Sequence, residues 1–178
     1  MSDSLYDGTI GTVKCAMETL AHLLRKAEES PNADSLLAAR LYDDMKPFTF
    51  QVYVATLMAE RTAARLAGRE TTVFEDNLAS YAEMHQRIDK VLKSLTAVDK
   101  DNYNKHADQV KPTQLPLGVE VDLSGAAYAH GMTVPNIFFH LNMVYAILRK
   151  EGVPLGKRDY LMPFLTTLTP YPVNKSGP

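Results

Sequence analysis

The chain has 178 residues, of which 46% are hydrophobic and 22% are charged, and its formal net charge at pH 7 is −2. This length and composition indicate one globular domain that buries a core, and the lack of Lys and Arg runs excludes the basic surface of a nucleic-acid-binding protein. The single cysteine, Cys15, excludes an intramolecular disulfide and favours a reducing, cytoplasmic location.

Four segments show apolar side chains spaced three and four residues apart, the pattern of amphipathic helices. The first is expected over residues 10–27 and ends before Pro31, because proline disfavours helical geometry at the residue that precedes it. The second begins near Asp34 and is expected to break or kink at Pro47. From Pro47 a stronger helix is predicted to run to Leu66.

The third helix is expected to begin at Thr72–Glu75, where the spacing reads as a capping box. Its apolar stripe includes His85, which turns outward if the neighbouring Met84 is the core residue. The sequence then changes character, and alternating apolar and acidic residues over 119–123 predict a short extended segment.

The fourth helix is expected from Thr133, its cap, through Pro135 in its first turn to Lys150. It is apolar on nearly every side, so it is either deeply buried or in contact with a second subunit. The proline-rich segment near the C-terminus is expected to be extended. These boundaries predict a helical domain over residues 1–162 and an extended tail over residues 163–178.

Four long helices, with a long, partly extended connection before the last one, are the layout of an all-α four-helix bundle. Sites in such bundles are built from polar side chains that point inward from facing helices. The first residues lack the basic and apolar regions of a signal peptide, and no apolar stretch is expected to span a membrane. Candidate functional residues are therefore the polar side chains on the apolar stripes.

Two groups of short motifs are similar to those of a known family. The C-terminal group consists of Phe138-Phe139-His140, Tyr145-Ala146-Ile147-Leu148-Arg149, Gly152-Val153 and Gly156-Lys157-Arg158-Asp159-Tyr160-Leu161. The N-terminal group consists of Leu37-Ala38-Ala39-Arg40-Leu41, Asp44-Met45, Pro47, Gln51-Val52 and Ala64-Arg65-Leu66-Ala67-Gly68. Over roughly residues 5–162, the chain resembles a family of domains of unknown function from bacteria and fungi, within the DinB/YfiT-like four-helix-bundle superfamily.

The resemblance implies a four-helix bundle that is often dimeric, with relatives that include thiol-dependent transferases and a thiol-dependent isomerase. Better-known relatives bind a divalent metal through one His on the second helix and an acid-or-His-x-x-x-His pair on the fourth. These positions fall near Gln51 and on Asn136 and His140 of this chain. Amide oxygens are weak ligands for zinc, so we expect no tightly bound transition metal.

His140 is the candidate acid or base of a polar pocket between the second and fourth helices, and His130 is expected at the mouth of the bundle. Two alternatives stay open: His140 is a buried, hydrogen-bonded structural side chain, and His130 is a solvent-facing loop residue. Gln51 and Asn136 are the partners expected for the His140 imidazole. The candidate ligand-binding residues are Gln51, Asn136, Tyr145 and Asp44.

Two charged segments have a structural and a functional interpretation. Asp44 lies in an acidic cluster beside the helix break, where it can meet a ligand or cap the helix that follows. The turn Gly156–Asp159 lacks the glycine spacing of a phosphate loop and is expected to tie the C-terminal segment to the bundle.

The sequence leaves two functions open. One is a small-molecule enzyme of the transferase, isomerase or lyase type. The alternative is a non-catalytic dimeric protein, ligand-binding or structural, whose aromatic fourth helix forms the partner surface. The sequence identifies no cofactor. The expected partners are a second copy of the chain and a small-molecule ligand, with neither nucleic acid nor membrane.

Overall fold

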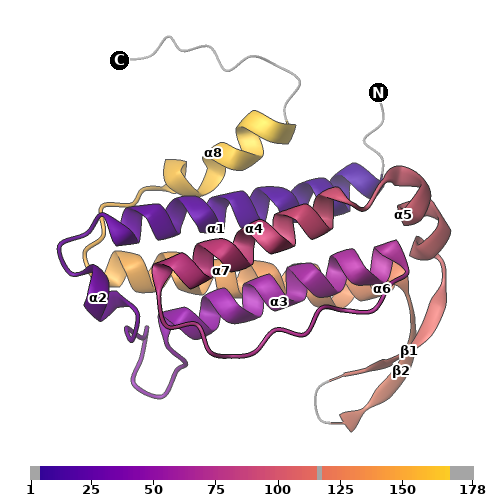
Figure 1. Cartoon of the computed structure of the whole chain (residues 1–178), viewed down its shortest axis with the longest axis horizontal. Coiled ribbons are helices and arrows are strands. Elements are labelled where there is room, and N and C mark those ends of the chain that lie inside the picture. The colour runs from indigo at the N-terminus through magenta and orange to yellow at the C-terminus, as the bar shows by residue number, and fades with distance from the viewer. Residues whose placement is uncertain (1–4, 116–117, 169–178) are drawn as a thin grey trace.

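The computed structural model describes residues 5–115 and 118–168 of the chain. Four long helices make up most of it (Figure 1): α1 (Thr12–Glu28), α3 (Phe48–Ala67), α4 (Tyr81–Thr96) and α7 (Val134–Lys150). The shorter helical elements are α2 (Ala33–Leu36), α5 (Lys100–Ala107), α6 (Gly125–Tyr128), α8 (Lys157–Leu168) and the π-helical turns η1 (Asp7–Gly11) and η3 (Ala129–Thr133). Two strands, β1 (Val110–Gln114) and β2 (Glu120–Ser124), form an antiparallel hairpin.

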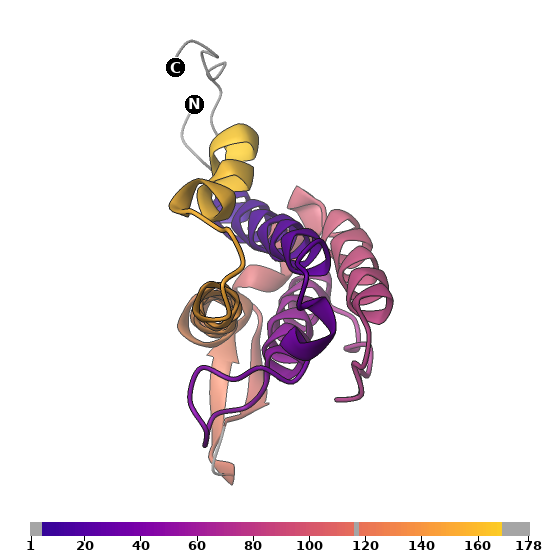
Figure 2. The ribbon, with the colours of Figure 1, turned by 90° about the vertical axis from the view of Figure 1, so that its left-hand side faces the viewer.

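The four long helices form a ring in the order α1, α4, α3, α7, and Figure 2 views this ring along the bundle. Helix α3 packs on α7 and α4, and α1 packs on α4, on α7 and, on its outer side, on α8. Each long helix contributes apolar side chains to one continuous core, among them Leu20, Ala59, Ile88 and Leu141, all at most 1% exposed. The predicted all-α four-helix bundle is confirmed.

The break predicted at Pro47 is confirmed, because α2 ends at Leu36 and α3 begins at Phe48, directly after the proline. Pro47 is extended and occupies the N-cap position, which carries no side-chain cap hydrogen bond. Asp44 is exposed and does not cap α3, so the capping role considered for it is wrong. At the other end of α3, Gly68 has φ +68° and closes the helix, as predicted.

The third predicted helix begins later than expected. Helix α4 starts at Tyr81, and its capping box is formed by Ser80 and Glu83 instead of Thr72 and Glu75. Glu83 accepts hydrogen bonds from the backbone N–H groups of Ala79 and Ser80, at 2.8 and 3.0 Å. Both sites satisfy the capping-box spacing, and residues 72–79 are non-helical in the fold.

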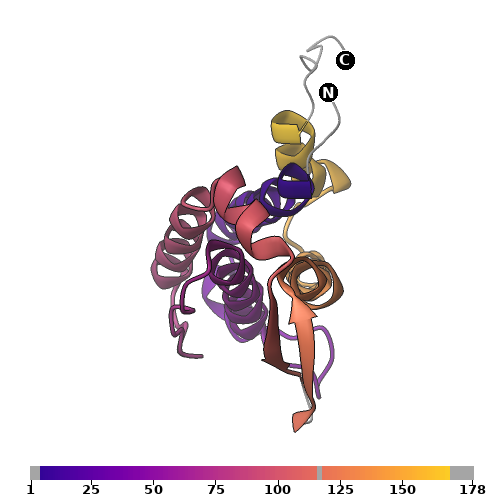
Figure 3. The same ribbon diagram turned by 90° about the vertical axis from the view of Figure 1, so that its right-hand side faces the viewer.

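The extended segment predicted over 119–123 is confirmed as β2, which pairs with β1 from Val110 opposite Ser124 to Gln114 opposite Glu120. Figure 3 shows the hairpin reaching away from the helices. Helix α5 precedes the hairpin in the chain. Gly125 lets α6 pack directly on α5, because a Cβ there would lie 2.4 Å from the backbone oxygen of His106.

The fourth predicted helix is longer than expected, because α6, η3 and α7 run on without interruption over residues 125–150. Thr133 is therefore not a cap. It is buried within the continuous helix, where its hydroxyl donates to the Ala129 carbonyl at 3.3 Å and accepts from Thr62 Oγ1 at 2.7 Å. Pro135 lies in the first turn of α7, as predicted, and Gly152, with φ +88°, follows its end.

By length and composition, the helix of residues 125–150 is the one candidate membrane span in the described part of the chain, with 33% of its most apolar window buried. No such stretch was expected from the sequence, and the 26-residue length arises from the joining of α6 and η3 to α7. This is weak evidence for a span, because the core helix of a soluble bundle passes the same test. In this fold α7 packs on α1 and α3.

The first residues of the expected extended tail are helical. Helix α8 continues to Leu168 with Pro163 inside it, so the prediction of extended structure from residue 163 is wrong for residues 163–168. Residues 169–178 of the expected tail lie outside the described residues. Aromatic contacts hold α8 in place: the ring centroids of Phe164 and Phe138 are 6.0 Å apart, and those of Tyr160 and Tyr145 are also 6.0 Å apart.

Candidate functional site

Helices α3 and α7 bring together the imidazole of His140 and the side-chain amide of Gln51. His140 Nδ1 lies 2.7 Å from Gln51 Oε1, and Gln51 is 3% exposed. The Gln51 amide nitrogen donates to the carbonyl of Lys46 at 2.9 Å, which leaves its oxygen as the acceptor for the imidazole. The predicted pairing of His140 with Gln51 is therefore present, and it joins the start of α3 to the middle of α7.

This hydrogen bond assigns the tautomer of His140. Because Gln51 Oε1 can only accept, Nδ1 carries the proton and Nε2 keeps a lone pair. Burial lowers the pKa of His140 to about 4, so the ring is neutral near pH 7. Nε2 has no hydrogen-bond partner among the described residues and is not sealed from solvent. The arrangement therefore presents an oriented, neutral acceptor at the surface of the bundle.

Two aromatic rings pack against the ring of His140. The ring centroid of Phe139 lies 5.2 Å from that of His140, and Phe50 lies 6.3 Å from it, both edge to face. Phe139 is 54% exposed, and the ammonium of Lys46 lies 5.4 Å from the Phe50 ring centroid. A molecule that reached His140 Nε2 would therefore meet aromatic rings and one cation close by.

Two of the other predicted ligand-binding residues lie apart from His140. Tyr145 packs against Tyr160 of α8, on a different side of α7 from the Gln51 contact. Asp44 is exposed in the connection before α3. The prediction that Tyr145 lines the same pocket is therefore wrong, and no contact in the described chain joins Asp44 to His140.

Asn136 and His130 also differ from expectation. Asn136 is half-buried one turn before His140, but no hydrogen bond joins the two within the described residues. His130 is exposed in η3, and its Nε2 lies 3.0 Å from Thr9 Oγ1. Ten helical residues separate it from His140, a distance of about 15 Å along the axis, so the two histidines do not form one catalytic pair.

The structure also shows which way His85 faces. Met84 is fully buried in the core, whereas His85 is half-buried with its Nε2 3.5 Å from Glu28 Oε2. His85 thus faces away from the interior, as the alternative reading of the stripe anticipated.

The positions that hold a metal in better-known relatives do not form a suitable donor set here. Gln51 Oε1 is engaged by the His140 N–H, and Asn136 is bonded to neither residue in the described structure. Within residues 5–115 and 118–168, no three His, Cys, Asp or Glu side chains are placed to hold an ion. One imidazole and two amides are a poor set for zinc, so no chemical step is assigned to a metal.

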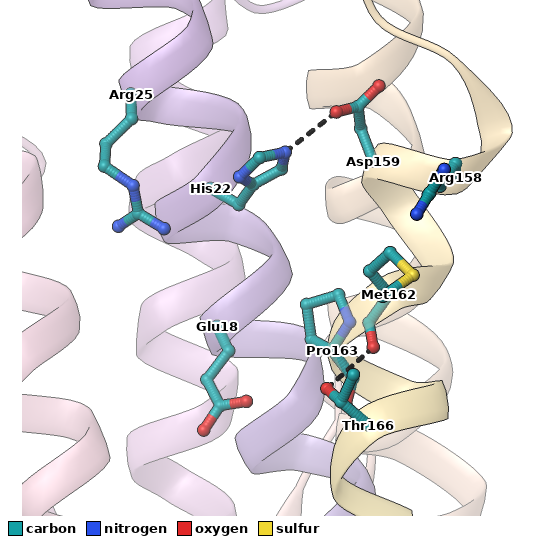
Figure 4. Close-up of a pocket in the computed structure, with 8 residues that line it drawn as sticks. All are labelled: Glu18, His22, Arg25, Arg158, Asp159, Met162, Pro163 and Thr166. Carbon is teal, nitrogen blue, oxygen red and sulfur yellow. Dashed lines mark hydrogen bonds and ion pairs between the residues drawn. The ribbon is translucent and has the colours of Figure 1, made fainter. Parts of the chain in front are cut away.

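A cavity of about 390 Å³ lies between α1 and α8 (Figure 4). His22 Nε2 and Asp159 Oδ1 meet beside it at 2.9 Å, and Asp159 Oδ2 accepts from the Gly156 N–H at 2.7 Å. The hydrogen bond from His22, followed by that from Gly156, holds the pKa of Asp159 below its usual value. These contacts attach α8 to α1, the role expected for the Gly156–Asp159 turn.

A second cavity, of about 530 Å³, lies between the C-terminal half of α3 and the β hairpin. Three arginines at spacings of four residues line it: Arg61, Arg65 and Arg69. This site was not predicted from the sequence. The spacing was visible in the sequence, but the hairpin that closes the cavity was not, because only one of its strands was predicted.

Comparison with known proteins places the chain in a family. The family model described as a domain of unknown function (DUF1993) matches residues 5–161. The crystal structure of a DinB family member protein from Shewanella denitrificans superimposes with a TM-score of 0.80 and 31% sequence identity, covering 95% of each chain. No match was found among curated proteins. The chain therefore belongs to the DUF1993 family and has the fold of DinB-like four-helix bundles.

Proposed function

We propose that the protein is a small-molecule enzyme of the transferase, isomerase or lyase type, with its site on the α3–α7 surface around His140. The observation that supports this most is the hydrogen bond between His140 Nδ1 and Gln51 Oε1, which fixes the ring and leaves Nε2 without a partner among the described residues. In this proposal Gln51 is a positioning residue, and His140 is the residue that meets the ligand.

The lowered pKa of His140 restricts the ligands that fit. A neutral imidazole accepts a hydrogen bond from a hydroxyl, thiol or N–H group, but it is a weak base toward protons of low acidity. We therefore propose a ligand with an acidic protic group, bonded to His140 Nε2 and packed against the rings of Phe50 and Phe139. The ligand's acidic proton compensates for the weak basicity of the imidazole.

His140→Ala is expected to weaken binding of such ligands at least tenfold, the effect of removing one well-oriented hydrogen bond at roughly 1.4 kcal/mol. The measurement is a titration at pH 7 of small thiols and phenols, which keep their proton at that pH, followed by chemical shifts of α3 and α7 amides. His85→Ala is the matched control, because His85 faces away from the core. Equal binding by wild type and His140→Ala, with the fold intact, would refute the proposed site.

The alternative, a non-catalytic dimer, rests on the exposed ring of Phe139. This ring packs edge to face on His140 on the outer surface of the bundle, where a second copy of the chain would cover it. In this alternative the protein forms a homodimer through this surface, which closes the His140 site to a ligand. Under either function, we propose that the protein works in the cytoplasm without nucleic acid or membrane.

If the dimer forms, sedimentation at tens of micromolar is expected to show about twice the 19.8 kDa chain mass. A stable interface of this kind buries roughly 1,200–2,000 Å² in total. Phe139→Ser should shift the protein toward the monomer. Val73→Ser is the matched control, since Val73 is also an exposed apolar residue, at 86% exposure. A monomeric wild type at these concentrations would contradict the dimer.

A further inference from the structure

The cavity beside the hairpin gathers positive charge that the bundle does not neutralise. Arg61 and Arg65 lie four residues apart on one face of α3, a spacing at which like charges repel, and Arg69 follows the end of the helix. Arg69 is paired with the buried Glu60 at 2.7 Å. Arg61 makes no hydrogen bond or ion pair with any described residue.

Arg65 is held in place by neutral oxygens alone. Its guanidinium donates to the carbonyls of Lys111 and Leu123 at 3.3 and 2.5 Å, and to Thr113 Oγ1 at 3.4 Å. The same group lies 5.3 Å from the ring centroid of Tyr128. Its Nε is buried without a partner in the described chain. The hairpin thus fixes a cation at the cavity wall while leaving its charge unpaired.

The charges around the cavity leave an excess of one positive charge. Four cations line it, Arg61, Arg65, Arg69 and Lys111, against the carboxylate of Glu70 at the wall, that of Glu60 behind Arg69 and that of Glu120, which accepts from the lining Gln114. The C-terminal end of α3 adds a partial negative charge of about half a unit, which offsets only part of this excess. Tyr128 adds a neutral hydroxyl, because burial raises its pKa.

We propose that this cavity binds a small molecule carrying a phosphate group, with Arg61 and Lys111 as its direct charged contacts and Arg65 as the fixed cation beneath them. A phosphate group carries the negative charge that this positive excess lacks, and guanidinium groups bind phosphate oxygens in pairs. The volume of about 530 Å³ is that of a small-molecule pocket. The site is separate from His140, since Arg61 lies about 15 Å along α3 from Gln51.

Titration calorimetry with inorganic pyrophosphate tests this proposal at moderate ionic strength. Wild type is expected to bind one equivalent, and Arg61→Gln and Lys111→Gln are each expected to weaken binding at least tenfold, a typical loss for one charge-assisted contact. Glu70→Gln should strengthen binding, because it removes the acid at the cavity wall. In NMR spectra, the largest amide shift changes on addition of pyrophosphate should fall on Lys111, Thr113 and Gln114.

Arg158→Gln is the matched control, because it removes one exposed arginine from α8 and leaves this cavity intact. Loss of binding in Arg61→Gln and Lys111→Gln, with binding retained in Arg158→Gln, supports the site. No binding by wild type at 10 mM pyrophosphate, roughly the weakest affinity of interest, overturns it. Equal weakening in Arg158→Gln overturns it as well, because the effect would then reflect net charge alone.

Discussion

Replacing Glu60 with Ala is expected to lower the free energy of unfolding by about 3 kcal/mol, the low end for breaking a buried ion pair. The Glu60 side chain is 1% exposed within α3. Its oxygens accept hydrogen bonds from Arg69, at 2.7 and 3.2 Å, and from the Thr72 N–H at 3.0 Å. Ser94 of α4 donates to the same carboxylate. One side chain thus joins α3, the segment after it and α4.

The hydrogen bonds of Glu60 make the free energy of unfolding depend on pH, and the sign of this dependence follows from its pKa. Burial alone raises the pKa of Glu60, but the bonds from Arg69, Ser94 and Thr72 outweigh it and leave the pKa lowered. A lowered carboxylate pKa stabilises the fold above the unfolded-state value, and this stabilisation is lost as the pH falls. Part of the effect is screened, since Arg69 is 38% exposed.

Urea denaturation at pH 7 measures the Glu60 prediction. Glu60→Gln separates charge from shape, because it keeps the acceptor oxygen and loses the ion pair with Arg69. Asp89→Ala is the control, an exposed carboxylate on α4 whose removal should cost less than about 0.5 kcal/mol. A loss below about 1 kcal/mol in Glu60→Ala would show that the contacts of the Glu60 carboxylate are unimportant for stability.

The second large effect is acid destabilisation through His140. The pKa of His140 is about 4 in the fold against 6.5 for the free side chain. The unfolded chain therefore takes up this proton first, and the contribution of His140 is fully present above about pH 6.5 and lost as the pH falls toward 4. After allowance for the partly solvated ring, we expect a loss of about 1–2 kcal/mol.

Comparison with His140→Gln isolates this contribution from carboxylates that titrate in the same range. The glutamine variant should show a flatter stability profile between pH 4 and 6.5, with the difference from wild type largest at pH 4. His85→Gln is the matched control, because it removes a histidine that lies outside the His140–Gln51 pair. Parallel profiles for wild type and His140→Gln would contradict the lowered pKa.

The pairing of His140 with Gln51 was predicted from the family resemblance, which sets both residues at positions that hold a metal in better-known relatives. Helical geometry agrees with it, because the inward faces of neighbouring bundle helices meet. Tyr145 was assigned to the same pocket against that geometry. Five residues along a helix turn the side chain by about 140°, and Tyr145 accordingly meets Tyr160 of α8.

The start of α4 and the end of α8 could not be read from local sequence. Thr72/Glu75 and Ser80/Glu83 share the capping-box spacing, and only the packed structure selects the second. Pro163 argued against a helix near the C-terminus, yet ring contacts of Tyr160 and Phe164 hold α8 on the bundle. In both places tertiary contacts decided between local alternatives.

The arginine cavity escaped prediction for a related reason. In the sequence, the spacing of Arg61 and Arg65 is that of an ordinary charged helix face. Only the hairpin, which packs beside them, makes them part of a cavity. The hairpin carbonyls that fix Arg65 belong to Lys111 and Leu123, some fifty residues later in the chain. A cavity assembled from such distant segments leaves no periodic signal in the sequence.

Nitrogen NMR of the imidazole side chains tests most directly whether His140 is a neutral hydrogen-bond acceptor held in one orientation. At pH 7 the His140 ring should show a protonated Nδ1 and an unprotonated Nε2, and the ring should titrate near pH 4. Gln51→Ala should move the pKa of His140 and mix the two tautomers, because Gln51 holds Nδ1. Titration of wild-type His140 near pH 6.5, or a proton on Nε2 at pH 7, would contradict the proposed site.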